Sequence, residues 1–134
     1  MANDKSAARP LSPHLQIYRP MLTMMMSIMH RITGVGLYFG IILLVWWLTA
    51  ASISDGYFAF VQGFFGHWFG RLLLFGFTWA LIHHMLGGLR HLIWDTGRGF
   101  EKASVKRLSW LTIVGSLILT AFIWGAGGFL ARYL

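Results

Sequence analysis

A chain of 134 residues has the usual size of a single domain. Hydrophobic residues make up 57% of it and charged residues only 11%, against about a quarter charged in ordinary soluble domains. This balance excludes an ordinary soluble protein and indicates a membrane protein. The net charge of +7 would suggest nucleic acid in a soluble protein. Here the cations lie at the ends of apolar runs, where basic residues set the orientation of a membrane protein. We therefore expect the chain to contact lipid and not nucleic acid.

Residues 1–20 are predicted to form an extended cytoplasmic arm. Pro10, Pro13 and Pro20 prevent a continuous helix there. The segment has neither a short apolar stretch nor a cleavage site, so it is not expected to be a secretory signal peptide. The chain has no cysteine, which excludes disulfides and thiolate metal sites. Residues 21–134 are predicted to form the membrane part.

Three apolar runs follow, predicted as spans at about residues 32–52, 68–92 and 109–130, each close to the roughly 20 residues needed to cross a bilayer. Residues 21–30 are predicted to be helical and interfacial, leading directly into the first span. The link at 53–67 is aromatic, with Asp55 its only formal charge, whereas the link at 94–108 carries four basic residues. This asymmetry places the N-terminus in the cytoplasm or mitochondrial matrix and the C-terminus on the opposite side. The predicted fold is all-α, a three-transmembrane-helix bundle with an N-terminal arm.

The stretch at residues 82–91, I-H-H-M-L-G-G-L-R-H, concentrates ionisable residues near the end of the second span. Ionisable residues inside a membrane are costly to bury, so we treat them as candidate functional residues. On a helix His84, Gly88 and His91 share one face, and His83, Gly87 and Arg90 form an adjacent stripe. A glycine one turn from a histidine leaves room for a flat macrocycle, as haem ligation by His84 would require. The structural alternative is that these histidines only hydrogen-bond to other helices.

Both axial ligands of a haem cannot easily come from this helix. His84 and His91 are separated by about 10 Å of helical rise, and opposite ligands must face each other across one iron. A second ligand would come from His30, His67 or another chain. Because His30 lies nearer the membrane edge than His84, a partner chain is favoured.

A second polar cluster begins the first span. Ser27 and Arg31 are four residues apart on one face, with His30 beside them. The second span returns to the same side of the membrane, so this cluster and His84 are expected to converge. Serine and arginine could hydrogen-bond a quinone oxygen, and Arg31 or His30 could pair with haem propionates. The alternative is that Arg31 is an ordinary positive-inside anchor.

Three motifs in order resemble a known family. They are R-P-L-S-P-H-L-x-I-Y at residues 9–18, S-I-M-H-R-I-T-G at 27–34, and H-M-L-G-G-L-R-H-L-I-W-D at 84–95. Together they are similar to the cytochrome b subunit of succinate dehydrogenase, respiratory complex II, of alphaproteobacterial or mitochondrial type. The resemblance extends over nearly the whole chain.

The resemblance implies that His84 is an axial ligand of haem b, with the other ligand supplied by a small membrane-anchor subunit. It implies that Ser27 and Arg31 line a ubiquinone site, that His30 and Arg31 lie near the haem propionates, and that His91 supports the haem. Flavoprotein and iron–sulfur subunits would be further partners, in the bacterial or mitochondrial inner membrane. This chain would be part of the enzyme without being competent alone. His83 is an additional histidine beside the expected ligand, and His84 is favoured over it because His84 has the Gly88 and His91 spacing.

Three other functions stay open from the residues. The chain could anchor a quinol:fumarate reductase, which runs the same chemistry in reverse. It could be a small transporter or proton-conducting subunit that uses His84 and Arg31 as a polar relay. It could also be a purely structural anchor.

Overall fold

The computed structural model describes residues 17–130, with side chains described as far as residue 128. The predicted arm at residues 1–20 therefore lies outside the described residues up to residue 16, as does most of the first of the three motifs. Within the described part, three helices are long and apolar enough to cross a membrane. The predicted all-helical fold with three such helices is confirmed.

Helix α2 (Leu22–Ile53) is continuous over 32 residues, so the predicted interfacial segment and first span form one helix. At 1.5 Å per residue it is about 48 Å long, well beyond the roughly 30 Å hydrocarbon core. Helices α4 (Trp68–Asp95) and α5 (Lys102–Leu130) are the other two spans. Helix α5 begins well before residue 109, because Lys102, Lys106 and Arg107 are good helix formers that continue the helix beyond the apolar run.

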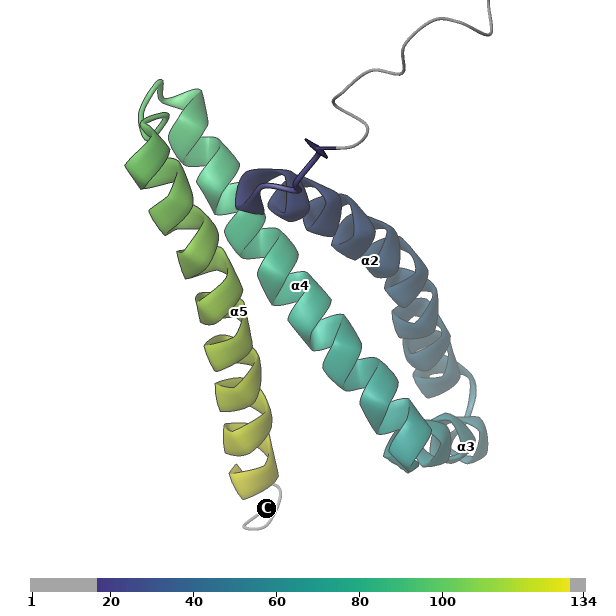
Figure 1. Ribbon diagram of the computed structural model, residues 1–134. Helices are drawn as coiled ribbons and strands as arrows, with labels where there is room; N and C mark the ends of the chain where they lie inside the picture. Colours follow the sequence, from purple (N-terminus) through teal and green to yellow (C-terminus); the bar gives the residue numbers. More distant parts are fainter. Residues whose placement is uncertain (1–16, 131–134) are drawn as a thin grey trace, which may run out of the picture.

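The link at residues 53–67, predicted as a simple connection, contains the short helix α3 (Asp55–Gly66). Ser54 caps it by accepting a hydrogen bond from the Tyr57 backbone N–H at 3.2 Å. Helix α3 is held against the end of α2 by a small apolar cluster whose buried members are Ala50, Val61 and Phe65. The helix therefore fixes the turn between α2 and α4 at this end of the bundle (Figure 1).

Helix α4 occupies the centre and packs against both α2 and α5 (Figure 1). Helix α5 carries a stripe of hydroxyl side chains, of which Ser116 contacts His83 of α4. All members of the stripe are buried: Ser109, Thr112, Ser116 and Thr120. Each of these hydroxyls donates to a carbonyl of its own helix at 2.7–2.9 Å. Small residues on this face allow the close helix approach that stabilises pairs in a membrane.

The loop between α4 and α5 turns sharply at two glycines. Gly97 and Gly99 have φ of +76° and +80°, a left-handed conformation that glycine adopts without steric cost. The Trp94 indole N–H donates to the Gly99 carbonyl at 3.2 Å, tying the loop to the end of α4. The loop at residues 96–101 thus has a defined shape.

Candidate functional site

A polar pocket of about 390 Å³ lies between α2 and α4, at the end of the bundle remote from α3. Its lining residues are Ser27, His30, Arg31, Gly34, His84 and His91. All five residues predicted for the site therefore meet at one pocket, and both predicted clusters contribute to it. The described lining includes one arginine and three histidines but no acidic side chain, which favours a ligand carrying negative charge.

The His84 ring is held by its Nδ1 atom. This nitrogen lies 3.1 Å from the His30 carbonyl oxygen, which can only accept, so the His84 Nδ1–H donates to it. The Thr33 hydroxyl oxygen and His30 Nδ1 lie 3.3 and 3.2 Å from the same atom. A histidine that donates through Nδ1 keeps the lone pair on Nε2, as a metal-binding histidine needs.

Two residues at this site were not predicted individually. Thr33 is 2% exposed and its hydroxyl donates to the backbone of α2 while contacting His84. A side chain at Gly34 would place its Cβ 3.0 Å from His84 Cε1, so only glycine leaves the ring its present position. The spacing of Ser27, His30 and Gly34 by three and four residues is the signal that could have identified Gly34 as part of this helix face.

The other polar residues surround this ring. His30 meets His84 edge to face with ring centroids 3.9 Å apart, and stacks on His91 with centroids 5.3 Å apart. Ser27 and Arg31 lie exposed at the edge of the pocket. From this position the Ser27 hydroxyl and the Arg31 guanidinium can contact a ligand bound in the pocket.

The structure places His83 in different surroundings from His84. His83 is 3% exposed and its Nδ1 lies 3.2 Å from the Ser116 hydroxyl of α5. It faces away from the pocket and forms the interhelical hydrogen bond that the structural alternative describes. His67 lies at the start of α4, about 25 Å of helical rise from His84, too far to share an iron with it.

His30 is also badly placed to be the opposite axial ligand. It contacts the Nδ1 edge of His84, whereas a ligand across the iron would face Nε2. Within the described part of the chain, no group of three His, Cys, Asp or Glu side chains is arranged to hold a bare metal ion. A haem would differ from a bare ion, because its porphyrin would supply four nitrogen ligands and leave fewer for the protein to provide.

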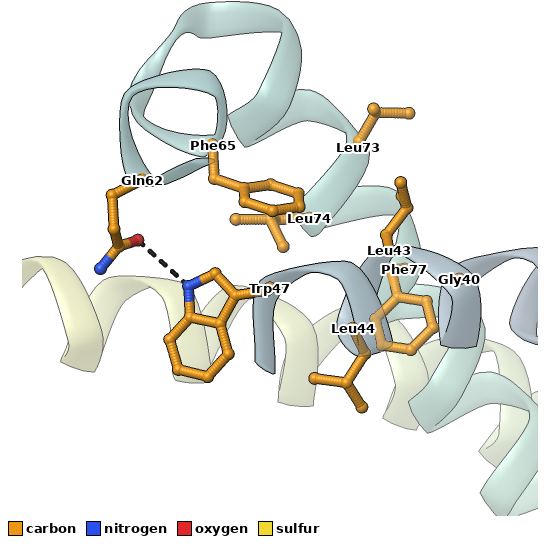
Figure 2. Close-up of a pocket in the computed structure, with 9 residues that line it drawn as sticks. All are labelled: Gly40, Leu43, Leu44, Trp47, Gln62, Phe65, Leu73, Leu74 and Phe77. Carbon is orange, nitrogen blue, oxygen red and sulfur yellow. Dashed lines mark hydrogen bonds between the residues drawn. The ribbon is translucent and has the colours of Figure 1, made fainter. Parts of the chain in front are cut away.

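A second pocket, of about 330 Å³, lies near α3 and has a different chemistry. Gln62 is the only polar non-aromatic side chain among its lining residues, and the Trp47 indole N–H donates to it at 3.3 Å. Figure 2 shows this bond between α2 and α3, with Phe77 beside Gly40. None of the described residues that line this pocket is ionisable, so the pocket does not match the predicted polar site.

Comparison with known proteins identifies the family. Residues 5–123 match the family described as succinate dehydrogenase/fumarate reductase transmembrane subunit. The chain belongs to this family. It is 47% identical over 119 residues to the succinate dehydrogenase cytochrome b556 subunit of Paracoccus denitrificans, covering 89% of this chain and 92% of that one. It is 38% identical over 116 residues to the b556 subunit of Rickettsia typhi, covering 87% and 90%.

A mitochondrial relative is also similar. The succinate dehydrogenase cytochrome b560 subunit of Sus scrofa is 40% identical over 95 residues, covering 68% of this chain and 55% of that one. The chain is therefore a multi-pass membrane subunit of the succinate dehydrogenase complex. This confirms the predicted resemblance, and it removes the independent transporter from the open functions.

Proposed function

We propose that this chain holds one face of a haem b through His84 and forms one wall of a ubiquinone site through Ser27 and Arg31. It would do so as the membrane anchor of a succinate:ubiquinone oxidoreductase. The relatives are named as cytochrome b subunits, a name that implies haem in those proteins. A bound haem would supply a one-electron redox centre at this position.

The observation that carries the proposal is the hydrogen bond from His84 Nδ1–H to the His30 carbonyl. Metal-ligating histidines usually donate their second ring N–H to such a group, which fixes the tautomer and the ring orientation. The residues present therefore fit a haem iron at Nε2. Gly88 supports the same fit, because within the described part of the chain no atom beyond the local helix backbone lies within 4 Å of where its Cβ would be, which leaves open space one turn from the ligand.

His84 offers only half of the coordination. His30 and His67 are both unsuited as the opposite ligand, for the geometric reasons given above, and His91 stands about two turns from His84 on the same helix. We therefore assign the second ligand to a small membrane-anchor partner subunit. His30, Arg31 and His91 would surround the haem, with Arg31 available for charge-assisted bonds to a propionate.

Ser27 and Arg31 would bind a quinone oxygen at the edge of the same pocket. The serine hydroxyl can donate one hydrogen bond, and the permanently charged guanidinium stabilises negative charge that develops on the oxygen as the ring is reduced. Both side chains are exposed in this chain, so partner subunits would close the site over them and exclude water.

The remaining partners follow from the division of labour in the complex. A flavoprotein subunit would oxidise succinate, and an iron–sulfur subunit would deliver electrons to the pocket end of the bundle. The basic residues of the loop and of the start of α5 lie at this end, so the positive-inside rule places it on the cytoplasmic or matrix face of the inner membrane. The relatives from Paracoccus denitrificans and Rickettsia typhi are named as subunits of succinate dehydrogenase, which favours this direction of turnover over quinol:fumarate reduction.

The test is a reduced-minus-oxidised optical spectrum of the complex purified with its native partners. His84→Ala should remove the haem bands, whereas His67→Ala, a histidine at the far end of the same helix, should keep them. A complex that assembles with His84→Ala and retains its haem would refute the ligand assignment.

A further inference from the structure

An unbroken series of aromatic contacts runs from His84 to the loop at residues 96–101. His84 touches His30, and His30 stacks on His91. His91 meets the Trp94 indole edge to face with centroids 5.1 Å apart. Trp94 in turn stacks on Phe100 at 6.1 Å. The Trp94 ring therefore contacts both His91 of the pocket and Phe100 of the loop.

Trp94 is also fixed by its polar contacts. Its indole N–H donates to the Gly99 carbonyl at 3.2 Å, so the loop determines where one edge of the ring lies. A Cβ at Gly99 would lie 3.5 Å from the indole, which shows how closely the loop backbone covers it. A movement of the loop that keeps this hydrogen bond would therefore move the Trp94 ring.

A buried cation also contacts the Trp94 indole. Arg90 is 4% exposed, and its Nε and Nη1 atoms have no hydrogen-bond partner among the described residues. Its guanidinium carbon lies 5.0 Å from the centroid of the Trp94 ring. This cation–π contact grows stronger where the cation is removed from water, so Arg90 resists any displacement of Trp94 away from it.

We propose that Trp94 is a positioning residue that transmits the conformation of the loop at residues 96–101 to His91 and His30. This inference rests on the proposed role of His84. His30 provides the carbonyl that orients the His84 ring, and the groups around a metal-binding histidine tune the redox potential of the metal. Trp94 thus links the shape of an extramembrane loop to the electronic properties of the site.

The experiment compares three variants of the assembled complex: Trp94→Leu, Trp94→Phe and Trp110→Leu. Leucine removes the ring and the N–H, while phenylalanine keeps a ring against His91 but cannot bond to Gly99. Trp110 is the matched control, since it lies on α5 and is 51% exposed. The measurements are haem content per complex, the low-spin electron paramagnetic resonance spectrum and the midpoint potential of the haem.

We expect Trp94→Leu to shift both the spectrum and the potential of the retained haem. Trp94→Phe should shift both in the same direction by a smaller amount, and Trp110→Leu should leave them unchanged. A Trp94→Leu complex with full haem and an unaltered spectrum and potential would overturn the proposal. Where the leucine variant does not assemble, the phenylalanine variant decides, because an unaltered potential there contradicts coupling through the loop. Failure of the His84 assignment is detected separately by the His84→Ala spectrum.

Discussion

The contact between Gly34 and His84 makes a quantitative prediction. In a Gly34→Ala variant the new Cβ would lie 3.0 Å from His84 Cε1 and 3.6 Å from Nδ1. Carbon atoms pack comfortably at about 3.5–4.0 Å, so the ring must retreat by roughly half an ångström. The bond from His84 Nδ1 to the His30 carbonyl, now 3.1 Å, would then approach about 3.6 Å and cease to be a hydrogen bond.

The loss of this bond should weaken haem binding. A neutral hydrogen bond contributes about 1 kcal/mol, and removing a group that orients a metal-binding histidine typically costs about 10–100-fold in metal affinity. We therefore expect Gly34→Ala to lower haem affinity by about that factor. The assay is haem retention per complex, followed optically during dilution into a haem-binding competitor protein.

Gly36→Ala is the matched control, because among the described residues no atom beyond the local helix backbone lies within 4 Å of its Cβ position. Both substitutions replace a glycine inside α2, so both share the gain of about 1 kcal/mol in helix propensity. The difference in haem retention between the two variants therefore reports only the contact of the new Cβ with His84. Equal haem retention in the two variants would refute the account of how His84 is held.

Three further predictions concern the rest of the chain. Ser27→Ala and Arg31→Ala should slow quinone reduction while succinate oxidation by an artificial dye stays near normal; equal loss of both activities would indicate an assembly defect. Gly40→Ala would drive its Cβ into an aromatic ring of α4, so thermal unfolding should show a destabilisation of about 1–3 kcal/mol, whereas Gly76→Ala, which has open space, should not. Ser116→Ala removes the partner of a buried histidine on α4, so it should weaken the bundle by about 0.6 kcal/mol in unfolding measurements without altering the haem spectrum.

Long, strongly apolar segments were the most predictable part of the fold. The spans at about 68–92 and 109–130 each lie within a helix of the structure, because length and hydropathy alone indicate them. Helix α3 was missed, since its aromatic and glycine-rich sequence has weak helix propensity. Ser54 before Asp55, with Val61 and Phe65 four residues apart, did carry cap and periodicity features that favoured a helix.

The convergence of Ser27 and His84 followed from helix spacing and antiparallel spans, and the structure brings both to one pocket. The spacing of Gly88 and His91 favoured His84 over His83, but spacing alone does not show which of the two adjacent side chains faces α2 and which faces α5. That arrangement depends on the position of α5, where Ser116 meets His83. The contact of Thr33 with His84 likewise depends on how two helices dock, which sequence periodicity does not encode.

The hydroxyl stripe of α5 has a consequence for how the protein is made. Ser109, Thr112, Ser116 and Thr120 each donate their proton to a carbonyl within α5 itself. A polar hydrogen exposed to lipid without an acceptor costs several kcal/mol, and here that cost is avoided before any neighbouring helix is present. Helix α5 can therefore enter the bilayer as an independent segment and associate with α4 afterwards. The remaining lone pairs on the hydroxyl oxygens can then accept hydrogen bonds from α4, and the Ser116 hydroxyl lies within hydrogen-bond distance of His83.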